Sequence, residues 1–161
     1  MDDSAAKDGD EETAGVRVFP PLLFAAGLGR GLLAGTVPQS ATYGTRARRL
    51  LGTLSIAIGA ASIAAAATQL KRAGSNVSPF APTTALVTTG IFRFTRNPMY
   101  FGLTSIYLGV ALIARSIPAF VMLPVTLALT DRFVVDREER YLEARFAAPY
   151  HTYKAAAPRW F

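Results

Sequence analysis

The sequence predicts an all-α protein, a polytopic membrane helical bundle with about four transmembrane helices and a cytoplasmic C-terminal helical cap. Hydrophobic residues make up 51% of the chain and charged residues only 17%, which is apolar for a soluble domain. The apolar residues gather in four long segments, and about 20 such residues span a bilayer core. Cysteine is absent, which excludes disulfides, thiolate metal sites and cysteine nucleophiles.

The first element is an acidic tail, residues 1–16, with the sequence MDDSAAKDGDEETAGV. Its charged residues and lack of bulky apolar ones predict a disordered, solvated segment. It has no basic region of the kind that opens a signal peptide, so no cleavage is expected. Residues 17–161 are predicted to form a single membrane domain.

The apolar segments predict the membrane spans of this domain. Their approximate ranges are 20–37, 50–70, 98–117 and 118–135. The second has no charge, whereas the first contains Arg30, whose place in the middle of a span is costly unless it faces protein or water. The last two are separated only by the corner before Pro118 and are expected to form a helical hairpin.

Gly27, Gly31 and Gly35 recur every four residues in the first span. This spacing predicts a small-residue face for close contact between membrane helices. A phosphate-binding loop is a weaker interpretation, because no strand precedes these glycines.

Residues 136–161 are charged and aromatic and form the predicted cap, in which Pro149 and Pro158 break any long helix. With four spans, twelve lysines and arginines lie on the side of the 71–97 loop and the C-terminus. The other side carries only Arg46, Arg48, Arg49 and Arg115. Basic residues favour the cytoplasmic side, so the loop and the C-terminus are expected there.

The stretch TTGIFRFTRNPMYFG, residues 88–102, combines arginines and aromatics at the start of the third apolar segment. Asn97 and Pro98 are typical of a helix start, and the neighbouring arginines and aromatics suit a membrane interface. The alternative is one side of a pocket for a charged, aromatic cofactor. The spacing alone favours the interface.

Glu138 and Glu139 leave a similar choice open. They can be solvated acids on an amphipathic helix, or carboxylates that bind a ribose diol or an ammonium group. His151 is the only histidine and is assigned no chemistry.

Three separated pieces, LVTTG, RNPMYFG and EERYLEARF with two later tyrosines, follow one another around the predicted hairpin. In this order they resemble the isoprenylcysteine carboxyl methyltransferase family, which is related to membrane phospholipid methyltransferases; this chain looks like a bacterial-type member. The resemblance covers roughly residues 19–161 and is closest over 71–161. It implies an integral membrane enzyme that uses S-adenosylmethionine without a Rossmann fold, with the cofactor at the cytoplasmic face.

The resemblance also implies the cofactor site. Carried over by position, the cofactor-binding residues are Thr84, Ala85, Leu86, Val87, Phe92, Asn97, Pro98, Met99, Tyr100, Glu138 and Glu139. Eukaryotic members have histidine where this chain has Asn97, and an amide cannot act as a base near neutral pH. No catalytic residue is assigned; Arg137 and Arg96 are candidates for positioning an anionic acceptor.

The expected function is therefore methyl transfer to a lipophilic acceptor, an isoprenylcysteine carboxylate or another hydrophobic acid, thiol or amine. A carboxylate or thiolate needs no general base, so positioning could supply most of the catalysis. Lipids are expected partners, and neither a metal nor a nucleic acid is. The alternatives are phospholipid N-methylation and a non-catalytic scaffold that keeps the fold.

Overall fold

The computed structural model describes residues 13–16, 18–36, 45–78 and 80–160, and every regular element in them is helical. The predicted all-α class is thus confirmed. Most of the predicted acidic tail and the end of the first predicted span lie outside the described residues. The division into spans stays a prediction, whereas the helices that fill them are described below.

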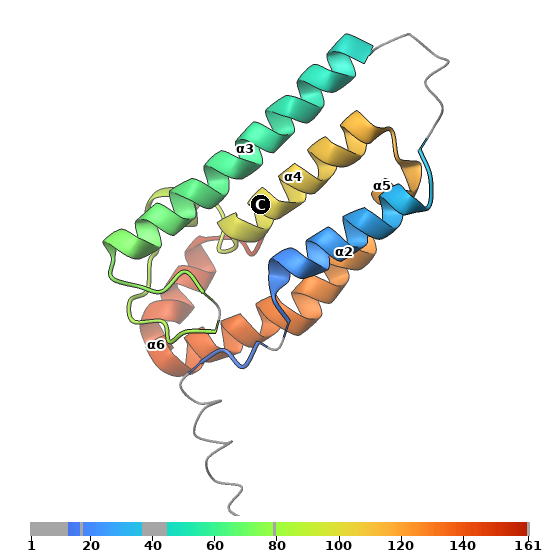
Figure 1. Cartoon of the computed structure of the whole chain (residues 1–161). Helices are drawn as coiled ribbons and strands as arrows, with labels where there is room; N and C mark the ends of the chain where they lie inside the picture. The colour runs from blue at the N-terminus through green and yellow to red at the C-terminus, as the bar shows by residue number, and fades with distance from the viewer. Residues whose placement is uncertain (1–12, 17, 37–44, 79, 161) are drawn as a thin grey trace, which may run out of the picture. The chain divides into compact units, whose positions relative to one another are not determined.

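Five α-helices, one 3-10 helix and one π-helix are described, and Figure 1 shows their order along the chain. They are α2 Pro20–Leu33, α3 Thr45–Arg72, η1 Gly90–Arg93, α4 Pro98–Ala114, α5 Ile117–Thr130, η2 Asp131–Val135 and α6 Asp136–Ala156. The chain divides into two compact units. We call residues 19–63 and 99–130 the helical unit, and the described part of 1–18, 64–98 and 131–161 the cap unit.

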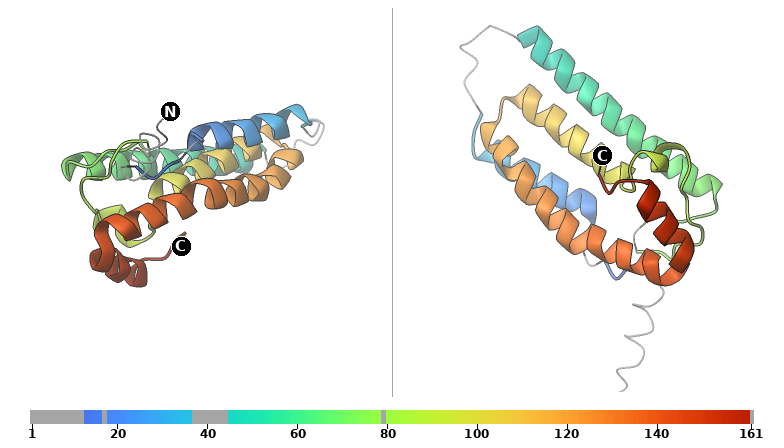
Figure 2. Two further views of the ribbon diagram at one scale, coloured as in Figure 1. Left: turned by 90° about the horizontal axis from the view of Figure 1, so that it is seen from below. Right: turned by 180° about the vertical axis from the view of Figure 1, so that it is seen from behind.

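In the helical unit, α2 packs against α5 through small residues (Figures 1 and 2). A side chain at Gly31 would collide with the backbone of Ala119, and one at Gly27 would collide with Thr126. Gly35 follows the end of α2 at a positive φ of 135°, and a Cβ there would meet nothing within 4 Å in the described part of the chain, although the Gly35 carbonyl accepts a hydrogen bond from Ser116. The predicted small-residue face is therefore correct for two of its three glycines.

The helices α3 and α4 also pack closely through glycines, which here lie on both helices. The carbonyl of Gly109 lies 2.9 Å from where a Gly52 Cβ would stand, and the carbonyl of Gly102 lies still closer to where a Gly59 Cβ would stand. Such contacts let two helix backbones approach closely. From the sequence, a small-residue packing face is predicted only for the first span.

The core of the helical unit gathers around Tyr107 of α4, whose hydroxyl donates to the carbonyl of Ala119 at 2.9 Å. Phe24, Ala111 and Leu123 complete the buried cluster. The hairpin corner lies at Arg115 and Ser116, between α4 and α5, as expected from Pro118.

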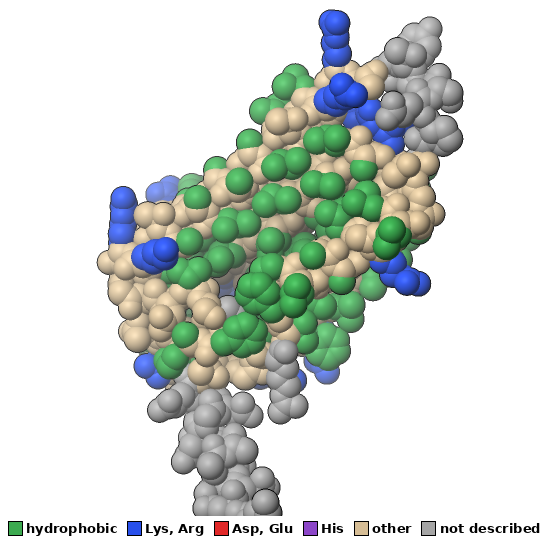
Figure 3. Space-filling model, in the orientation of Figure 1, with side chains coloured by type: hydrophobic (Ala, Val, Ile, Leu, Met, Phe, Trp, Pro, Cys, Tyr) green, Lys and Arg blue, Asp and Glu red, His purple; other side chains and the backbone are tan. Residues whose placement is uncertain are grey.

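Hydrophobic side chains also cover much of the outer surface of this unit (Figure 3). On α3 the exposed ones are Leu50, Leu51, Leu54 and Ile58. The helix α3 and the apolar part of the continuous helix from Ile117 are long and apolar enough to cross a membrane. Only 22% and 28% of their apolar windows are buried, so most of these side chains need an apolar environment outside the protein.

In the cap unit, the π-helix η2 carries the chain from α5 into α6 without a break. Within α6, Ala147 has a positive φ of 43°, which kinks the helix two residues before Pro149. The predicted disruption at Pro149 is confirmed, because proline cannot continue the hydrogen bonding of an undistorted helix. The kink redirects the last turns of α6, which carry Tyr150 and Tyr153.

Candidate functional site

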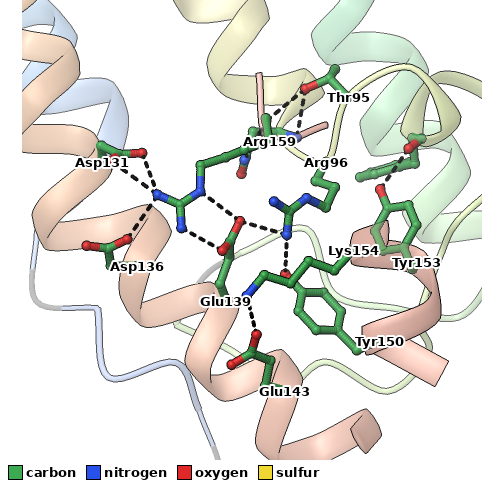
Figure 4. A network of polar contacts seen from close by, with 12 residues as sticks. Thr95, Arg96, Asp131, Asp136, Glu139, Glu143, Tyr150, Tyr153, Lys154 and Arg159 are labelled. Carbon is green, nitrogen blue, oxygen red and sulfur yellow. Dashed lines mark hydrogen bonds and ion pairs between the residues drawn. The ribbon is translucent and has the colours of Figure 1, made fainter. Parts of the chain in front are cut away.

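The cap unit is organised around the carboxylate of Glu139 (Figure 4). Its Oε1 lies 3.0 Å from a terminal nitrogen of Arg96 and 3.1 Å from Nε of Arg159, and a terminal nitrogen of Arg159 donates to Oε2 at 2.7 Å. Only 7% of the Glu139 side chain is exposed. A buried carboxylate of this kind is tolerated because both oxygens receive charged donors.

Arg159 extends this network to two further acids. Its second terminal nitrogen lies 3.2 Å from Asp131 and 3.1 Å from Asp136, on η2 and at the start of α6. The hydrogen bond to Glu139 raises the pKa of Arg159 above its ordinary value. The guanidinium therefore clamps η2 and α6 to the C-terminal segment.

The backbone of that segment is fixed from the other side by the loop before α4. The carbonyl of Arg159 accepts hydrogen bonds from the Thr95 hydroxyl at 3.0 Å and from the Asn97 amide at 2.9 Å. The Arg96 backbone N–H donates to the Pro158 carbonyl at 2.9 Å. Thr95, Arg96 and Asn97 thus fix the backbone of residues 158 and 159.

Two tyrosines of the second half of α6 complete the cluster. The hydroxyl of Tyr153 donates to the carbonyl of Phe92 at 2.7 Å, and a nitrogen of Arg96 lies 3.5 Å from the hydroxyl of Tyr150. Burial, helped by the Glu139 charge, raises the pKa of Tyr150 from 10.0 to about 12. Burial likewise raises the pKa of Tyr153, so both phenols are neutral at physiological pH.

The predicted stretch 84–87 is irregular chain in the cap unit, with a bend at Ala85. The Thr84 hydroxyl donates to the Gly74 carbonyl at 2.6 Å. The backbone groups of Ala85, Leu86 and Val87 have no hydrogen-bond partner in the described part of the chain. Free N–H and C=O groups in a half-buried segment suit the predicted role of lining a ligand with backbone.

The motif around Phe92 divides between two environments. Phe92 and Asn97 are buried, whereas Phe94 is 64% exposed and Arg93 stacks over its ring at 4.8 Å. The outward pair matches the membrane-interface interpretation, and the buried residues belong to the polar cluster. The interface interpretation therefore fits the outward pair, and the cofactor-pocket interpretation stays a prediction for the buried residues.

Pro98 is buried at the start of α4, and Met99 and Tyr100 begin the part of α4 that belongs to the helical unit. Tyr100 is buried, and its carbonyl accepts a hydrogen bond from Thr104 at 2.8 Å. The structure brings Arg96, Asn97 and Glu139 together, and Met99 and Tyr100 stay predicted site residues outside this cluster.

The two acidic candidates differ. Glu139 is buried and paired, so the solvated-acid interpretation is wrong for it, whereas Glu138 is half-exposed. The Nε of Arg96 is buried and has no hydrogen-bond partner among the residues that the structure describes. An unpaired buried donor is costly, and it is an available contact for an anionic ligand group.

The two candidate acceptor arginines also differ. Arg96 is already engaged with Glu139, whereas Arg137 lines an open pocket of about 550 Å³ and donates to the Gly15 carbonyl at 2.8 Å. Arg140 and Arg145 line the same pocket, together with Tyr141 and residues 13–14, and none of the described residues that line it is acidic. Of the two, Arg137 has the surroundings suited to holding an anion.

Sequence reasoning missed Arg159, which contacts more of the cluster than any predicted residue. The residue that could have pointed to Arg159 is Asp131, an acid at the end of an apolar segment. An acid in that position needs a cation, and Arg159 in the C-terminal PRW sequence supplies it.

The long helices with exposed apolar side chains, together with the charged cap unit, indicate that the chain is a helical membrane protein. The model of the phospholipid methyltransferase family matches residues 47–148, which include both Arg96 and Glu139. The chain therefore belongs to the phospholipid methyltransferase family, as its sequence motifs predicted, and is a membrane methyltransferase. No curated protein and no solved structure is significantly similar to it.

Proposed function

We propose that this protein transfers a methyl group from S-adenosylmethionine to a lipophilic acceptor that carries an anionic group. The observation that carries the proposal is the family match over residues 47–148, which encloses the buried Arg96–Glu139 pair. No metal takes part in the proposed reaction, and the residues of the cap unit supply the contacts.

The residues present fit this cofactor. It carries a carboxylate and an ammonium group on its methionine moiety, a ribose diol and an adenine ring. The unpartnered Nε of Arg96 is a donor for a carboxylate, and Glu139 accepts two hydrogen bonds from Arg159 and forms an ion pair with Arg96, which leaves acceptor capacity for an ammonium or hydroxyl group. The free backbone groups of Ala85, Leu86 and Val87 supply further donors and acceptors.

When bound, the cofactor supplies an electrophilic methyl group on a positively charged sulfur. The chain itself would hold the reactants and exclude water. Asn97 cannot serve as a base, and its amide is engaged with the Arg159 carbonyl. An acceptor that is already nucleophilic as a carboxylate or thiolate suits such a site, because orientation is then the main requirement.

The basic pocket favours an anionic acceptor. Arg137, Arg140 and Arg145 line it, and no acid occurs among its lining residues in the described part of the chain, so a carboxylate is attracted and a lone ammonium is repelled. This supports a carboxylate acceptor of the isoprenylcysteine kind. Phospholipid N-methylation is the second candidate, favoured by the description of the family that matches, since the phosphate of such a lipid is also an anion.

We further propose that the protein lies in a bacterial cytoplasmic membrane, with the cap unit and the C-terminus on the cytoplasmic side. The distribution of lysine and arginine supports this orientation. The water-soluble cofactor would then reach the cap unit from the cytosol, and the acceptor would arrive from the lipid.

A labelled-methyl assay tests the activity. The purified chain in vesicles is incubated with methyl-labelled S-adenosylmethionine and a membrane lipid extract, and the product is identified by mass. We expect label in an extractable lipid that mild alkali releases as methanol, because carboxyl esters hydrolyse. Alkali-stable label would indicate an N- or S-methyl product instead, and no label from folded protein that binds the cofactor would favour the non-catalytic scaffold.

A further inference from the structure

Arg30 is the only charged residue of α2. It lies in the last turn of α2 and is exposed, and its guanidinium group has no hydrogen-bond or ion-pair partner in the described part of the chain. No aspartate or glutamate occurs in residues 19–63 or 99–130. The helical unit therefore cannot neutralise this charge from within.

Arg30 lines an open pocket of about 1020 Å³ between α2 and α5. The other described residues that line it are all apolar or glycine: Ala26, Gly29, Leu33, Ala34, Ile117, Pro118, Val121 and Met122. Leu33, Ile117 and Val121 are strongly exposed for hydrophobic residues. A single cation beside such a surface matches a ligand with an anionic head and an apolar body.

The walls of this pocket are held by the α2–α5 contact. Gly31 lies against the backbone of Ala119, and the Ser116 hydroxyl donates to the Gly31 carbonyl at 2.9 Å. Gly29 has nothing within 4 Å of its would-be Cβ, so the pocket is open beside Arg30. Because the walls of the pocket are already fixed, a ligand can bind without the entropy loss of ordering them.

The position of the pocket along the helices agrees with a lipid headgroup. Four more arginines lie at the same end of the helical unit, where α3 begins and α4 ends: Arg46, Arg48, Arg49 and Arg115. Arg48 donates to the carbonyls of Leu112 and Ile113, which caps the end of α4. Arginines gather at the depth of the lipid phosphates, where their charge remains hydrated.

We infer that the pocket of Arg30, between α2 and α5, binds one anionic phospholipid. The phosphate pairs with the Arg30 guanidinium, and an acyl chain covers Leu33, Ile117 and Val121. A net-anionic headgroup is favoured over a zwitterionic one, because the helical unit has no acid to receive an ammonium group. This site belongs to the helical unit and does not depend on the proposed methyl transfer.

Native mass spectrometry of the full chain in a neutral detergent tests the inference. The probes are phosphatidylglycerol and phosphatidylcholine with identical acyl chains, and inorganic phosphate is the competitor. The variant is Arg30→Gln, and the control is Arg46→Gln, which removes the same charge from another exposed arginine of this end. Thermal unfolding checks that both variants fold.

We expect the wild type to retain phosphatidylglycerol in preference to phosphatidylcholine, with no displacement by millimolar phosphate. Arg30→Gln should weaken phosphatidylglycerol binding about tenfold or more, which is the loss of one charge-assisted hydrogen bond. Arg46→Gln should bind nearly as the wild type does. Equal weakening in both variants, unchanged binding in Arg30→Gln, equal retention of the two lipids, or displacement by phosphate would each overturn the inference.

Discussion

At Glu139, two guanidinium groups converge on a carboxylate that is almost fully withdrawn from solvent. The pairing explains why a buried acid is tolerated in the cap unit. A neighbouring contact sets the expectation for Asn97→Asp, which keeps a residue type that caps helices well. The Asn97 amide donates to the Arg159 carbonyl, so an aspartate there would lose that bond and repel the carbonyl oxygen.

Arg159→Gln should destabilise the protein. The substitution removes the ion pairs of Asp131 and Asp136 with Arg159. It also leaves Arg96 as the remaining cation beside Glu139 in the described cluster. Because the Arg159 side chain is partly exposed, we expect a loss of about 1–3 kcal/mol in the free energy of unfolding. Thermal unfolding in detergent measures it.

Lys154→Gln is the matched control for Arg159→Gln, because Lys154 pairs with Glu143 at the surface. Exposed pairs contribute little, so this variant should unfold like the wild type. Equal effects of the two substitutions would contradict the assigned role of Arg159.

Tyr150 should make the folded state sensitive to alkali. Its pKa is raised from 10.0 to about 12, so the unfolded chain loses this proton before the folded chain does. The stability from the neutral phenol is complete below pH 10 and falls as the pH rises from about 10 to 12. Chemical unfolding across this range should show the loss, and Tyr150→Phe should reduce it; an identical pH profile in the variant would contradict the assignment.

At the scale of the elements, the sequence predicts more of the helices than of their contacts. Apolar length and Pro118 identify the hairpin of α4 and α5, because a bilayer-length apolar run leaves few alternatives to a helix. The glycines of α2 indicate one packing face. The pairing of glycines on α3 and α4 is not visible in either segment alone, because it needs both helices in register.

Gly102→Ala should weaken the α3–α4 pair. The added Cβ would lie 2.5 Å from the Ile63 side chain and 2.7 Å from the Gly59 carbonyl, so the helices must separate. We expect a net loss of about 1–3 kcal/mol in stability, as for other overpacked sites. The control is Gly29→Ala, whose Cβ meets nothing within 4 Å and which gains helix propensity. Thermal unfolding that ranks Gly29→Ala below Gly102→Ala would refute the close approach.

The candidate site was predictable only in part, for reasons visible at Arg159 and Glu139. Family motifs identified Glu139 because it lies in a recognisable run of residues around α6. Arg159 joins it through a kink at Ala147 and a turn of the chain that no local pattern encodes. The buried, unpartnered Nε of Arg96 likewise follows from three-dimensional packing and not from spacing.

For the whole molecule, the proposed orientation can be tested because the chain has no cysteine of its own. Single cysteines are introduced as Arg46→Cys, at the start of α3, and Thr152→Cys, late in α6; both positions are exposed. In intact bacterial cells, a membrane-impermeant maleimide should label only the first, and after lysis it should label both. Labelling of Thr152→Cys before lysis would place the cap unit outside the cytoplasm.

The central claim is that the cap unit holds S-adenosylmethionine, and isothermal titration of the purified full chain after chelation of metals tests it most directly. We expect saturable binding without added metal. Affinity should fall about ten- to a hundredfold in Glu139→Gln, and it should stay unchanged in Glu143→Gln, which alters a carboxylate outside the network. Protein that shows a normal unfolding transition but no binding heat, or equal affinities in the two variants, would contradict the claim.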